Sequence, residues 1–370
     1  MIWLFVGAIV PGLVVSWAAG HFIRRRAAAW GLVDHPGQRK VHQQATPLGG
    51  GLAIWLGVIG PFALGQAVLW SVNHGWIDAE ILPDFVRPHL AGLTQQSSQL
   101  WFLLGAGTVL MLLGLADDLR GLDWRFRLAV QTFVAGVVIW QGWQFTLFVP
   151  VPWLTAALTV AWIVGLVNSF NMLDNMDGLS GGVAVIAASM LAGVVLIAKD
   201  PATGEPQLFV AGLLLVLVGA VLGFLWHNRP PARLFMGDAG SYLLGFLLAM
   251  ATILATFTGG RLPTHAILTP LFVLAVPLYD TLTVVLIRLR AGRSPFEGDK
   301  SHFSHRLVEL GMTKGQAVLT IYLTTATCGL GAFLLHQVDT TGAVILVLLV
   351  GCVLTLIALL ESSARRKQGK

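Results

Sequence analysis

The sequence contains little charge. Only 11% of its 370 residues are Asp, Glu, Lys or Arg, whereas 56% are hydrophobic. Soluble domains carry about 25% charged residues, so this composition excludes an ordinary soluble protein. Apolar stretches of roughly 18 or more residues recur along the chain, and each could cross a hydrocarbon core of about 30 Å as a helix. The sequence therefore predicts an all-α, polytopic integral membrane protein, with residues 1–370 forming a single transmembrane domain.

Cysteine is also scarce, and basic residues are missing from the N-terminus. Cys328 and Cys352 both fall in apolar stretches, which is typical of small packed side chains rather than of a disulfide or a metal site. Arg24, Arg25 and Arg26 follow the first apolar stretch instead of preceding it. Because a signal peptide begins with a basic segment, we expect a retained first span with the N-terminus outside.

About eleven apolar stretches are candidate spans. Lys and Arg gather in cytoplasmic loops, so the basic residues test this count. With the N-terminus outside, all 23 Lys and Arg residues except Arg87, Lys199 and Arg261 fall in cytoplasmic segments, including the C-terminal ARRKQGK. We therefore predict a cytoplasmic C-terminus. The candidate spans are 2–20, 48–70, 100–116, 127–142, 152–169, 179–198, 208–226, 239–258, 266–288, 316–336 and 342–360.

Five polar loops lie on the predicted cytoplasmic side. They contain every acidic pair, the two Gly-flanked Asp motifs and the pair of His302 and His305. Chance placement would have distributed these groups over both faces of the membrane. We therefore expect one active site, built near residues 31–51, 116–128, 168–182, 227–241 and 293–307.

The third loop has an unusual polar pattern. NSFNMLDNMDG places Asn168, Asn171, Asp174 and Asp177 at three-residue intervals after an uncharged apolar run. On a helix each such step drifts by about 60°, so neighbours stay adjacent while the first and last face opposite sides. A helix cap needs only one such residue. The pattern favours a functional site at the membrane boundary, with a purely structural role as the alternative.

The charged side chains of these loops suit a phosphate-bearing substrate. Mg²⁺ prefers hard oxygen ligands and usually combines one or two carboxylates with substrate phosphates. Cationic side chains bind phosphate directly. We therefore predict phosphoryl transfer, in which a metal ion bridges a diphosphate that basic residues clamp. The acidic candidates are Asp117, Asp118, Asp174, Asp177 and Asp238, and the basic ones are Arg39, Lys40, Arg125, Arg127, Arg229 and Arg233.

Several motifs have structural alternatives. The acidic pair of ADDLRG could be a solvated helix cap, and FMGDAGS could be a turn before the next span. His302 and His305 could be a zinc pair, but the absence of another nearby His or Cys favours phosphate binding. Asp280 lies inside the predicted span 266–288. A carboxylate at such a position is a candidate functional group, or a partner for a neighbouring helix.

Taken in order, the motifs resemble those of a known enzyme family. ADD, NSFNMLDNMDGLSGG, LFMGDAGS and SPFEGDKSHFSHRL follow one another as in the polyprenyl-phosphate N-acetylhexosamine-1-phosphate transferases. GLVDHPGQRKVHQ, followed by TPLGGG, also fits. The family includes the undecaprenyl-phosphate GlcNAc-1-phosphate transferases and the phospho-MurNAc-pentapeptide translocases. The span count and the DxxHxxH stretch resemble the GlcNAc branch more than the translocases.

The resemblance implies a multi-pass enzyme of the bacterial inner membrane, with an active site that faces the cytoplasm. It would transfer an N-acetylhexosamine 1-phosphate, GlcNAc 1-phosphate in this branch, from a UDP-sugar to undecaprenyl phosphate. UMP would be released, and the product would start a lipid-linked cell-envelope glycan. The implied cofactor is Mg²⁺, or Mn²⁺ in its place. The implied partners are UDP-N-acetylhexosamine, polyprenyl phosphate and membrane lipid, without nucleic acid and with a homodimer as a possible assembly.

The resemblance also assigns roles to residues. Asp238, helped by Asn171, would bind the metal ion. Asp117 and Asp118 would lie beside the lipid phosphate, and Arg127 would clamp phosphate. The residues that would hold the nucleotide, the diphosphate or the sugar are Lys40, Asn168, Asp174, Asp177, Phe235, His302, His305 and Arg306.

Two positions depart from the family pattern. Ser304 stands where a His is common, which puts the diphosphate contacts of this loop in doubt. Arg127 stands where we expect Lys in eukaryotic relatives. Because Arg is a rigid fork rather than a mobile point charge, it would clamp phosphate differently.

Two other functions use similar residues. An intramembrane prenyltransferase also holds Mg²⁺ and diphosphate on Asn- and Asp-rich loops, but it leaves FMGDAGS and the histidine pair without a role. A nucleotide-sugar transporter would place polar groups near the bilayer midplane between inverted repeats, and no repeat is visible in the sequence. For the transferase we expect direct attack by the lipid phosphate. A covalent carboxyl-phosphate on Asp117 or Asp118 is the alternative.

Overall fold

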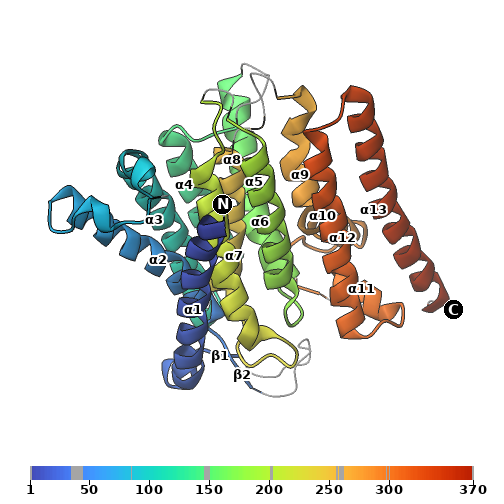
Figure 1. The fold of residues 1–370 in the computed structure, drawn as a ribbon. Helices are drawn as coiled ribbons and strands as arrows, with labels where there is room; N and C mark the ends of the chain where they lie inside the picture. Colours follow the sequence, from blue (N-terminus) through green and yellow to red (C-terminus); the bar gives the residue numbers. More distant parts are fainter. Residues whose placement is uncertain are drawn as a thin grey trace.

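The computed structural model describes residues 2–34, 45–84, 86–145, 151–200, 203–255, 257, 262–296, 298–299 and 301–368. Long helices stand side by side as a bundle (Figure 1), which confirms the all-α prediction. They are α1 (Ile2–Arg26), α2 (Gly50–Asn73), α3 (Leu90–Arg120), α4 (Trp124–Trp140), α5 (Pro152–Leu173), α6 (Leu179–Ile197), α7 (Leu208–Asn228), α8 (Gly237–Leu254), α9 (Thr269–Val273), α10 (Ala275–Arg290), α11 (Phe303–Glu309), α12 (Lys314–Leu335) and α13 (Thr340–Gln368). The remaining elements are 3-10 helices at Ala27–Trp30, Ala79–Ile81, Arg87–His89 and Thr264–Leu268, and the antiparallel strands β1 (Val33–Asp34) and β2 (Thr46–Pro47).

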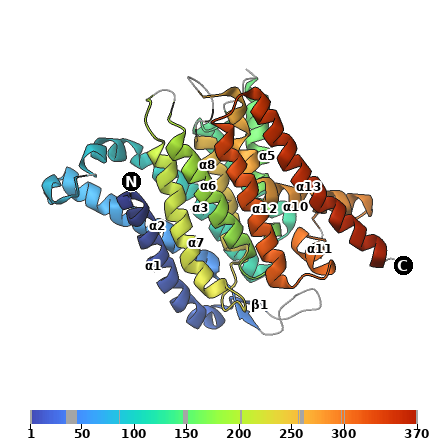
Figure 2. The same cartoon turned by 45° about the vertical axis from the view of Figure 1, so that its right-hand side comes forward.

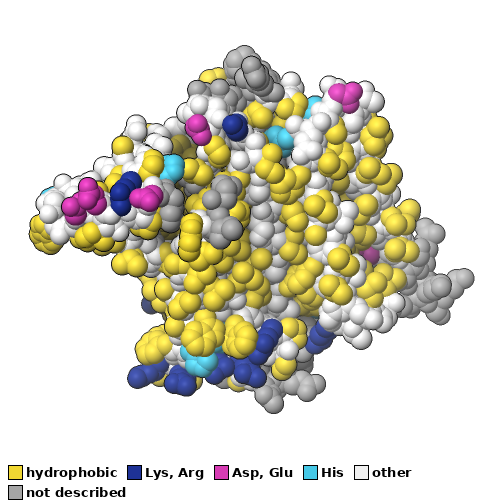
Figure 3. Space-filling model, viewed as in Figure 1, with side chains coloured by type: hydrophobic (Ala, Val, Ile, Leu, Met, Phe, Trp, Pro, Cys, Tyr) yellow, Lys and Arg dark blue, Asp and Glu magenta, His cyan; other side chains and the backbone are white. Residues whose placement is uncertain are grey.

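Most of the predicted spans correspond to helices that could cross a membrane. Within the described ranges nine helices are long and apolar enough, and the bent pair Thr264–Val273 and Ala275–Arg290 would make a tenth. The predicted span 127–142 corresponds to α4, which has only 17 residues. The polytopic architecture agrees with the prediction, while the count of eleven and the orientation stay predictions. On the face shown in Figure 3, Lys and Arg side chains gather at the lower end, below a hydrophobic band.

The predicted span 266–288 is not a straight helix. Its two parts meet at an angle of 67°, at Leu274 between α9 and α10. Pro277 explains the break, because it has no N–H to donate to the carbonyl of Val273 and its ring would crowd that turn. The bend gives α10 its own direction, and α10 contributes to the cavity described below.

The segment 71–99, which lies between two predicted spans, is partly helical. Helix α3 begins at Leu90, ten residues before the predicted span, and its N-terminal part runs beside the end of α2. Gln66 of α2 accepts hydrogen bonds from the Ser97 hydroxyl (2.5 Å) and from Nε1 of Trp101 (3.2 Å). These contacts join two helices that lean out together in Figures 1 and 2.

Helix α8 lies at the centre of the bundle. Nearly all of its side chains are buried, and it packs against α2, α3 and α5. The approach of α3 is close enough that a Cβ at Gly114 would collide with the carbonyl group of Asp238. Because Asp238 is in the first turn of α8, this packing places it beside the end of α3, where Asp117 and Asp118 lie.

Candidate active site

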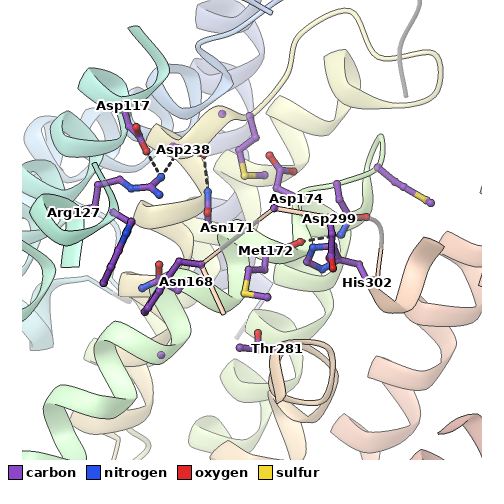
Figure 4. Close-up of a pocket in the computed structure, with 18 of the residues that line it drawn as sticks. Asp117, Arg127, Asn168, Asn171, Met172, Asp174, Asp238, Thr281, Asp299 and His302 are labelled. Carbon is purple, nitrogen blue, oxygen red and sulfur yellow. Dashed lines mark hydrogen bonds and ion pairs between the residues drawn. The ribbon is translucent and has the colours of Figure 1, made fainter. Parts of the chain in front are cut away.

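All five predicted cytoplasmic loops contribute to one cavity of about 1300 Å³. Figure 4 shows its side chains converging from α3, α4, α5, α8 and the segment before α11. Lys40 lies outside the described residues, and Arg306 is not among the residues that line the cavity. The other predicted site residues all line it: Asp117, Asp118, Arg127, Asn168, Asn171, Asp174, Asp177, Phe235, Asp238, His302 and His305.

Asp238 is the meeting point of two predicted groups. Asn171 donates from Nδ2 to Oδ1 of Asp238 (2.6 Å) and to the hydroxyl of Ser241 (3.2 Å). On its other side, Nη1 of Arg127 lies 3.6 Å from Oδ2 of Asp238. The side chains of Arg127 and Asp238 keep 27% and 28% of their surface exposed, so both remain open to a ligand. The site thus combines an anionic group, an amide and a fixed cation.

Asp117 is held from three sides at the end of α3. Its Oδ1 accepts from the backbone N–H of Leu122 (2.6 Å). Its Oδ2 accepts from Arg127 and from the hydroxyl of Tyr242 (3.3 Å). The carboxylate is 5% exposed. Asp117 therefore fixes the guanidinium of Arg127 where it reaches towards Asp238.

Asp118 has a different position from its neighbour. Its Oδ1 accepts from the backbone N–H of Asp238 (2.9 Å), and its Oδ2 accepts from that of Ala239 (3.2 Å). It thereby satisfies two N–H groups that the first turn of α8 leaves unpaired, and its charge complements the positive end of that helix. Gly237 is the first residue of α8 and has φ +72°, and a Cβ there would lie 2.5 Å from Oδ2 of Asp118.

The NSFNMLDNMDG segment distributes its polar groups over several partners. Asn168 donates from Nδ2 to Oε1 of Gln131 (2.6 Å) and to the carbonyl of Val164 (2.8 Å). Asp177 accepts from the backbone N–H of Ala232 (2.9 Å). These contacts tie the third loop to α4 and to the fourth loop.

Asp174 is the C-cap residue of α5 and lines the cavity. Burial, together with the charges of Asp118 and Asp177, raises the pKa of Asp174 to about 7. A nearby cation would stabilise the charged form of a carboxyl group in such surroundings. Its assignment to nucleotide binding stays a prediction.

The two predicted histidines lie at the start of α11, where His302 is the N-cap residue and His305 is in the first turn. Both His302 and His305 line the cavity, and their ring centroids are 6.4 Å apart. Because His302 is the N-cap residue and His305 is the third residue of the helix, both side chains lie at the N-terminal end of α11. Ser304 is instead buried, and its hydroxyl donates to Oδ1 of Asn175. The departure at Ser304 therefore falls on the face of α11 that packs against the third loop.

Arg306 also lies on the buried side of α11. Its Nε donates to Oε2 of Glu361 (2.9 Å), and its Nη2 donates to the hydroxyl of Thr283 (3.0 Å). Its side chain is 3% exposed. These partners connect α11 to α13 and α10, and the assignment of Arg306 to substrate binding stays a prediction.

Known proteins resemble this chain over most of its length. Residues 100–256 match glycosyl transferase family 4. The chain is 32% identical, over 86% of its length and 81% of the relative, to a probable undecaprenyl-phosphate N-acetylglucosaminyl 1-phosphate transferase of Bacillus subtilis. It is 33% identical, over 94% of its length and 87% of the relative, to the decaprenyl-phosphate N-acetylglucosaminephosphotransferase of Mycobacterium tuberculosis. The chain belongs to the polyprenyl-phosphate N-acetylhexosamine-1-phosphate transferases.

A more distant member of this transferase family shows the same relationship. The undecaprenyl-phosphate α-N-acetylglucosaminyl 1-phosphate transferase of Escherichia coli is 29% identical over 82% of the chain and 77% of its own length. The matched residues 100–256 include Asp117, Asp118, Arg127, the NSFNMLDNMDG segment and Asp238. The family match therefore covers most of the acidic residues that line the cavity.

The donor atoms around Asp238 fit a hard divalent cation. Among the described residues no three His, Cys, Asp or Glu side chains form a ready-made metal cage. Mg²⁺ does not require one, because it usually takes one or two protein ligands and completes its shell with phosphate and water. Asp238 offers a partly exposed carboxylate, and Asn171 contacts it through Nδ2, which leaves its amide oxygen for a cation. These two residues would hold the ion.

Some residues that line the cavity or support its side chains were missed from the sequence. Tyr242 lies one helical turn after Asp238, and that i, i+4 spacing was a usable signal. Asp299, the first residue of the DxxHxxH stretch, was assigned no role from the sequence. Its Oδ1 pairs with Nη2 of Arg288 (3.0 Å). Trp124 and Phe296 stack at the cavity with ring centroids 4.1 Å apart. They are 172 positions apart in the chain, so no local pattern relates them.

Proposed function

We propose that the protein transfers GlcNAc 1-phosphate from UDP-GlcNAc to undecaprenyl phosphate on the cytoplasmic side of the membrane, with Mg²⁺ as cofactor and UMP as the second product. The observation that carries this proposal is the two-part lining of the cavity. Carboxylates, amides, Arg127 and the histidines form one part. Apolar side chains of α4, α5 and α10 form the other.

The apolar part suits the acceptor. Its α5 side presents Ala157, Val160, Ala161 and Val164, and Val285 of α10 also lines it. A polyprenyl phosphate has one charged end on a long hydrocarbon chain. The chain would lie along the apolar wall while its phosphate reached Arg127 and the acidic cluster. The relatives named above act on undecaprenyl or decaprenyl phosphate, which supports the same acceptor class here.

The proposed reaction is a single displacement. An oxygen of the lipid phosphate attacks the β-phosphorus of the UDP-sugar, and the bond from that phosphorus to the bridging oxygen breaks. The bridging oxygen leaves with UMP, and the lipid carries a diphospho-sugar. An alkyl phosphate has a second pKa near 6, as phosphoserine does, so the acceptor is mostly dianionic at pH 7 and needs no strong base.

Charge neutralisation is the larger requirement, because acceptor and donor are both anions. When bound, Mg²⁺ would neutralise charge on the diphosphate and stabilise the leaving phosphate. Arg127 supplies a cation that Asp117 and the hydroxyl of Tyr242 keep in place. His302 and His305 present imidazoles to the same cavity, where they can bind phosphate oxygens.

The surroundings of the two adjacent aspartates favour direct displacement over a covalent intermediate. Both carboxylate oxygens of Asp117 accept hydrogen bonds, and so do both oxygens of Asp118. An attack from either residue would have to give up one of these partners. This arrangement suits an orienting role for Asp117.

The proposal is tested with purified protein in detergent, undecaprenyl phosphate, Mg²⁺ and a panel of UDP-sugars, by measuring UMP. We expect UMP from UDP-GlcNAc only when both lipid and metal are present. EDTA and Asp238→Asn should abolish it, whereas Asp84→Asn, a control at a carboxylate that is 96% exposed in an outer segment, should not.

Two results would overturn the proposal. If folded protein released no UMP from any UDP-sugar but transferred a prenyl group, it would be a prenyltransferase. If it moved nucleotide sugar into vesicles without a lipid acceptor, it would be a transporter.

A further inference from the structure

A buried carboxylate within the bent span holds the histidine loop. Asp280 of α10 is 1% exposed. Its Oδ1 accepts from the backbone N–H of Phe303 (2.6 Å), and its Oδ2 lies 3.0 Å from Nδ1 of His302. A carboxylate inside a membrane span is costly unless it is paired. Both of its oxygens find partners in the segment that carries the cavity histidines.

This contact determines which atom His302 offers to the cavity. A carboxylate can only accept, so Nδ1 of His302 carries the hydrogen of their bond. Nε2, on the opposite side of the ring, is then the nitrogen available to a ligand. His302 is 7% exposed yet lines the cavity, so its ring has little freedom to turn.

We propose that Asp280 is a positioning residue: it accepts the Nδ1 hydrogen of His302 and fixes the direction of the ring so that, when the ring carries a proton on both nitrogens, Nε2 donates to a phosphate oxygen of the sugar nucleotide. The same principle is known for metal-binding histidines, whose second nitrogen is oriented by a carboxylate. This proposal rests on the proposed function and adds Asp280 of α10 to the residues that position its substrate.

Other residues of α10 hold the same segment but act on different atoms. Arg288 donates from Nη1 to the carbonyl of Pro295 (2.6 Å) and from Nη2 to Oδ1 of Asp299 (3.0 Å). The hydroxyl of Thr283 accepts from Arg306 (3.0 Å). Of these three α10 residues, Asp280 is the one whose partner is an imidazole. A general anchoring role can therefore be separated from an effect on His302.

Asp280→Asn isolates the histidine contact. The asparagine keeps an oxygen that can accept from Phe303 but presents an amide to His302. We expect kcat/KM for UDP-GlcNAc to fall about 10- to 100-fold, as it does for partners of oriented histidines elsewhere. Thr283→Val is the matched control, because it removes one hydrogen bond between α10 and α11 without touching an imidazole; it should change kcat/KM less than the Asp280 variant does.

A double-mutant cycle with His302→Ala shows whether Asp280 acts through the ring. If it does, Asp280→Asn should cost at most about twofold once the imidazole is gone, because the coupling between the two residues is then lost. Equal losses in both backgrounds would overturn the proposal. So would an unchanged kcat/KM for Asp280→Asn while wild-type protein is active.

A measurement on wild-type protein covers the case in which the Asp280 variant does not fold. Nitrogen-15 spectra of labelled histidine, with His302→Gln to assign the signal, report which ring nitrogen is protonated. Protonated Nδ1 at His302 is the expected result, and a hydrogen on Nε2 with Nδ1 bare would overturn the inference. This readout needs no turnover. If wild-type protein made no UMP, the proposed function would fail while the tautomer result still stood.

Discussion

Asp118 binds the backbone of Asp238, at 2.9 Å from its N–H, whereas Asp117 binds the guanidinium that faces the Asp238 side chain. Two consecutive carboxylates thus have separate tasks. Asp118 fixes the first turn of α8, and Asp117 fixes Arg127. Asp238 is held between them.

The first prediction concerns the cap that Asp118 provides. Asp118→Ala should lower the free energy of unfolding by about 1–2 kcal/mol, because two N–H groups of α8 lose their acceptor. Asp118→Asn keeps one acceptor oxygen and should lose less. Thermal unfolding in detergent measures both. Equal stability of the alanine variant and wild type would contradict the capping role.

The second prediction concerns Gly237. Gly237→Ala should lower both UMP formation and the unfolding temperature, because the backbone has φ +72° and the new Cβ would meet the Asp118 carboxylate. The left-handed backbone alone costs an alanine about 1–2 kcal/mol. Gly105→Ala in α3, where a Cβ meets nothing within 4 Å, should leave activity unchanged. A fully active Gly237→Ala enzyme would show that the close approach at α8 is dispensable.

The third prediction addresses the departure from the family at Ser304. This side chain is buried against Asn175 and does not line the cavity. Ser304→His should therefore destabilise α11 and lower activity instead of restoring a phosphate contact. Ser304→Ala should cost only about 1 kcal/mol of stability, since one hydrogen bond is lost. A lower KM for UDP-GlcNAc in Ser304→His would contradict this placement.

The fourth prediction is a pH dependence of stability. Partial burial disfavours ionisation of Asp299, but hydrogen bonds from Arg288 and Ser301 outweigh it and lower the pKa of this carboxyl from 3.8 to about 2. Because the folded state binds this proton more weakly than the unfolded chain, Asp299 stabilises the fold above its unfolded pKa, and the gain is lost as the pH falls from 3.8 towards 2. The unfolding temperature of Asp299→Asn should lie below that of wild type near neutral pH, and the difference should shrink as the pH falls from 3.8 to about 2.

The fifth prediction separates the two residues of the proposed metal site. Asn171→Ala should raise the Mg²⁺ concentration for half-maximal activity by about tenfold, the lower end of the loss seen when supporting groups are removed. Asp238→Asn should leave no activity at any Mg²⁺ concentration. Titration of UMP formation with Mg²⁺ tests both. An unchanged Mg²⁺ requirement in Asn171→Ala would remove Asn171 from the site.

Much of the site could be predicted from the sequence because its residues lie in short patterns. Asn168, Asn171, Asp174 and Asp177 recur every three residues, and all four line the cavity. His302 and His305 line the cavity as well, because they are the N-cap and the third residue of α11. The apolar runs between the loops indicated most of the helices, since about 18 apolar residues already suffice for a span.

What the sequence did not reveal depends on contacts between distant segments. The caps made by Asp118 and the ion pair of Arg306 with Glu361 join residues more than fifty positions apart. Whether Asp280 was functional or merely paired could not be decided until its partner was known. Pro277 could have predicted the break at Leu274, but the uniformly apolar stretch around it favoured one continuous span.

The most direct test of the account identifies the lipid product. Purified protein is incubated with undecaprenyl phosphate, UDP-GlcNAc and Mg²⁺, and the lipid is analysed by mass spectrometry while UMP is counted. The account predicts a lipid heavier by one phospho-N-acetylhexosamine unit, formed in equal amount to UMP. UMP without that lipid, or a lipid that gained the sugar without its phosphate, would contradict it.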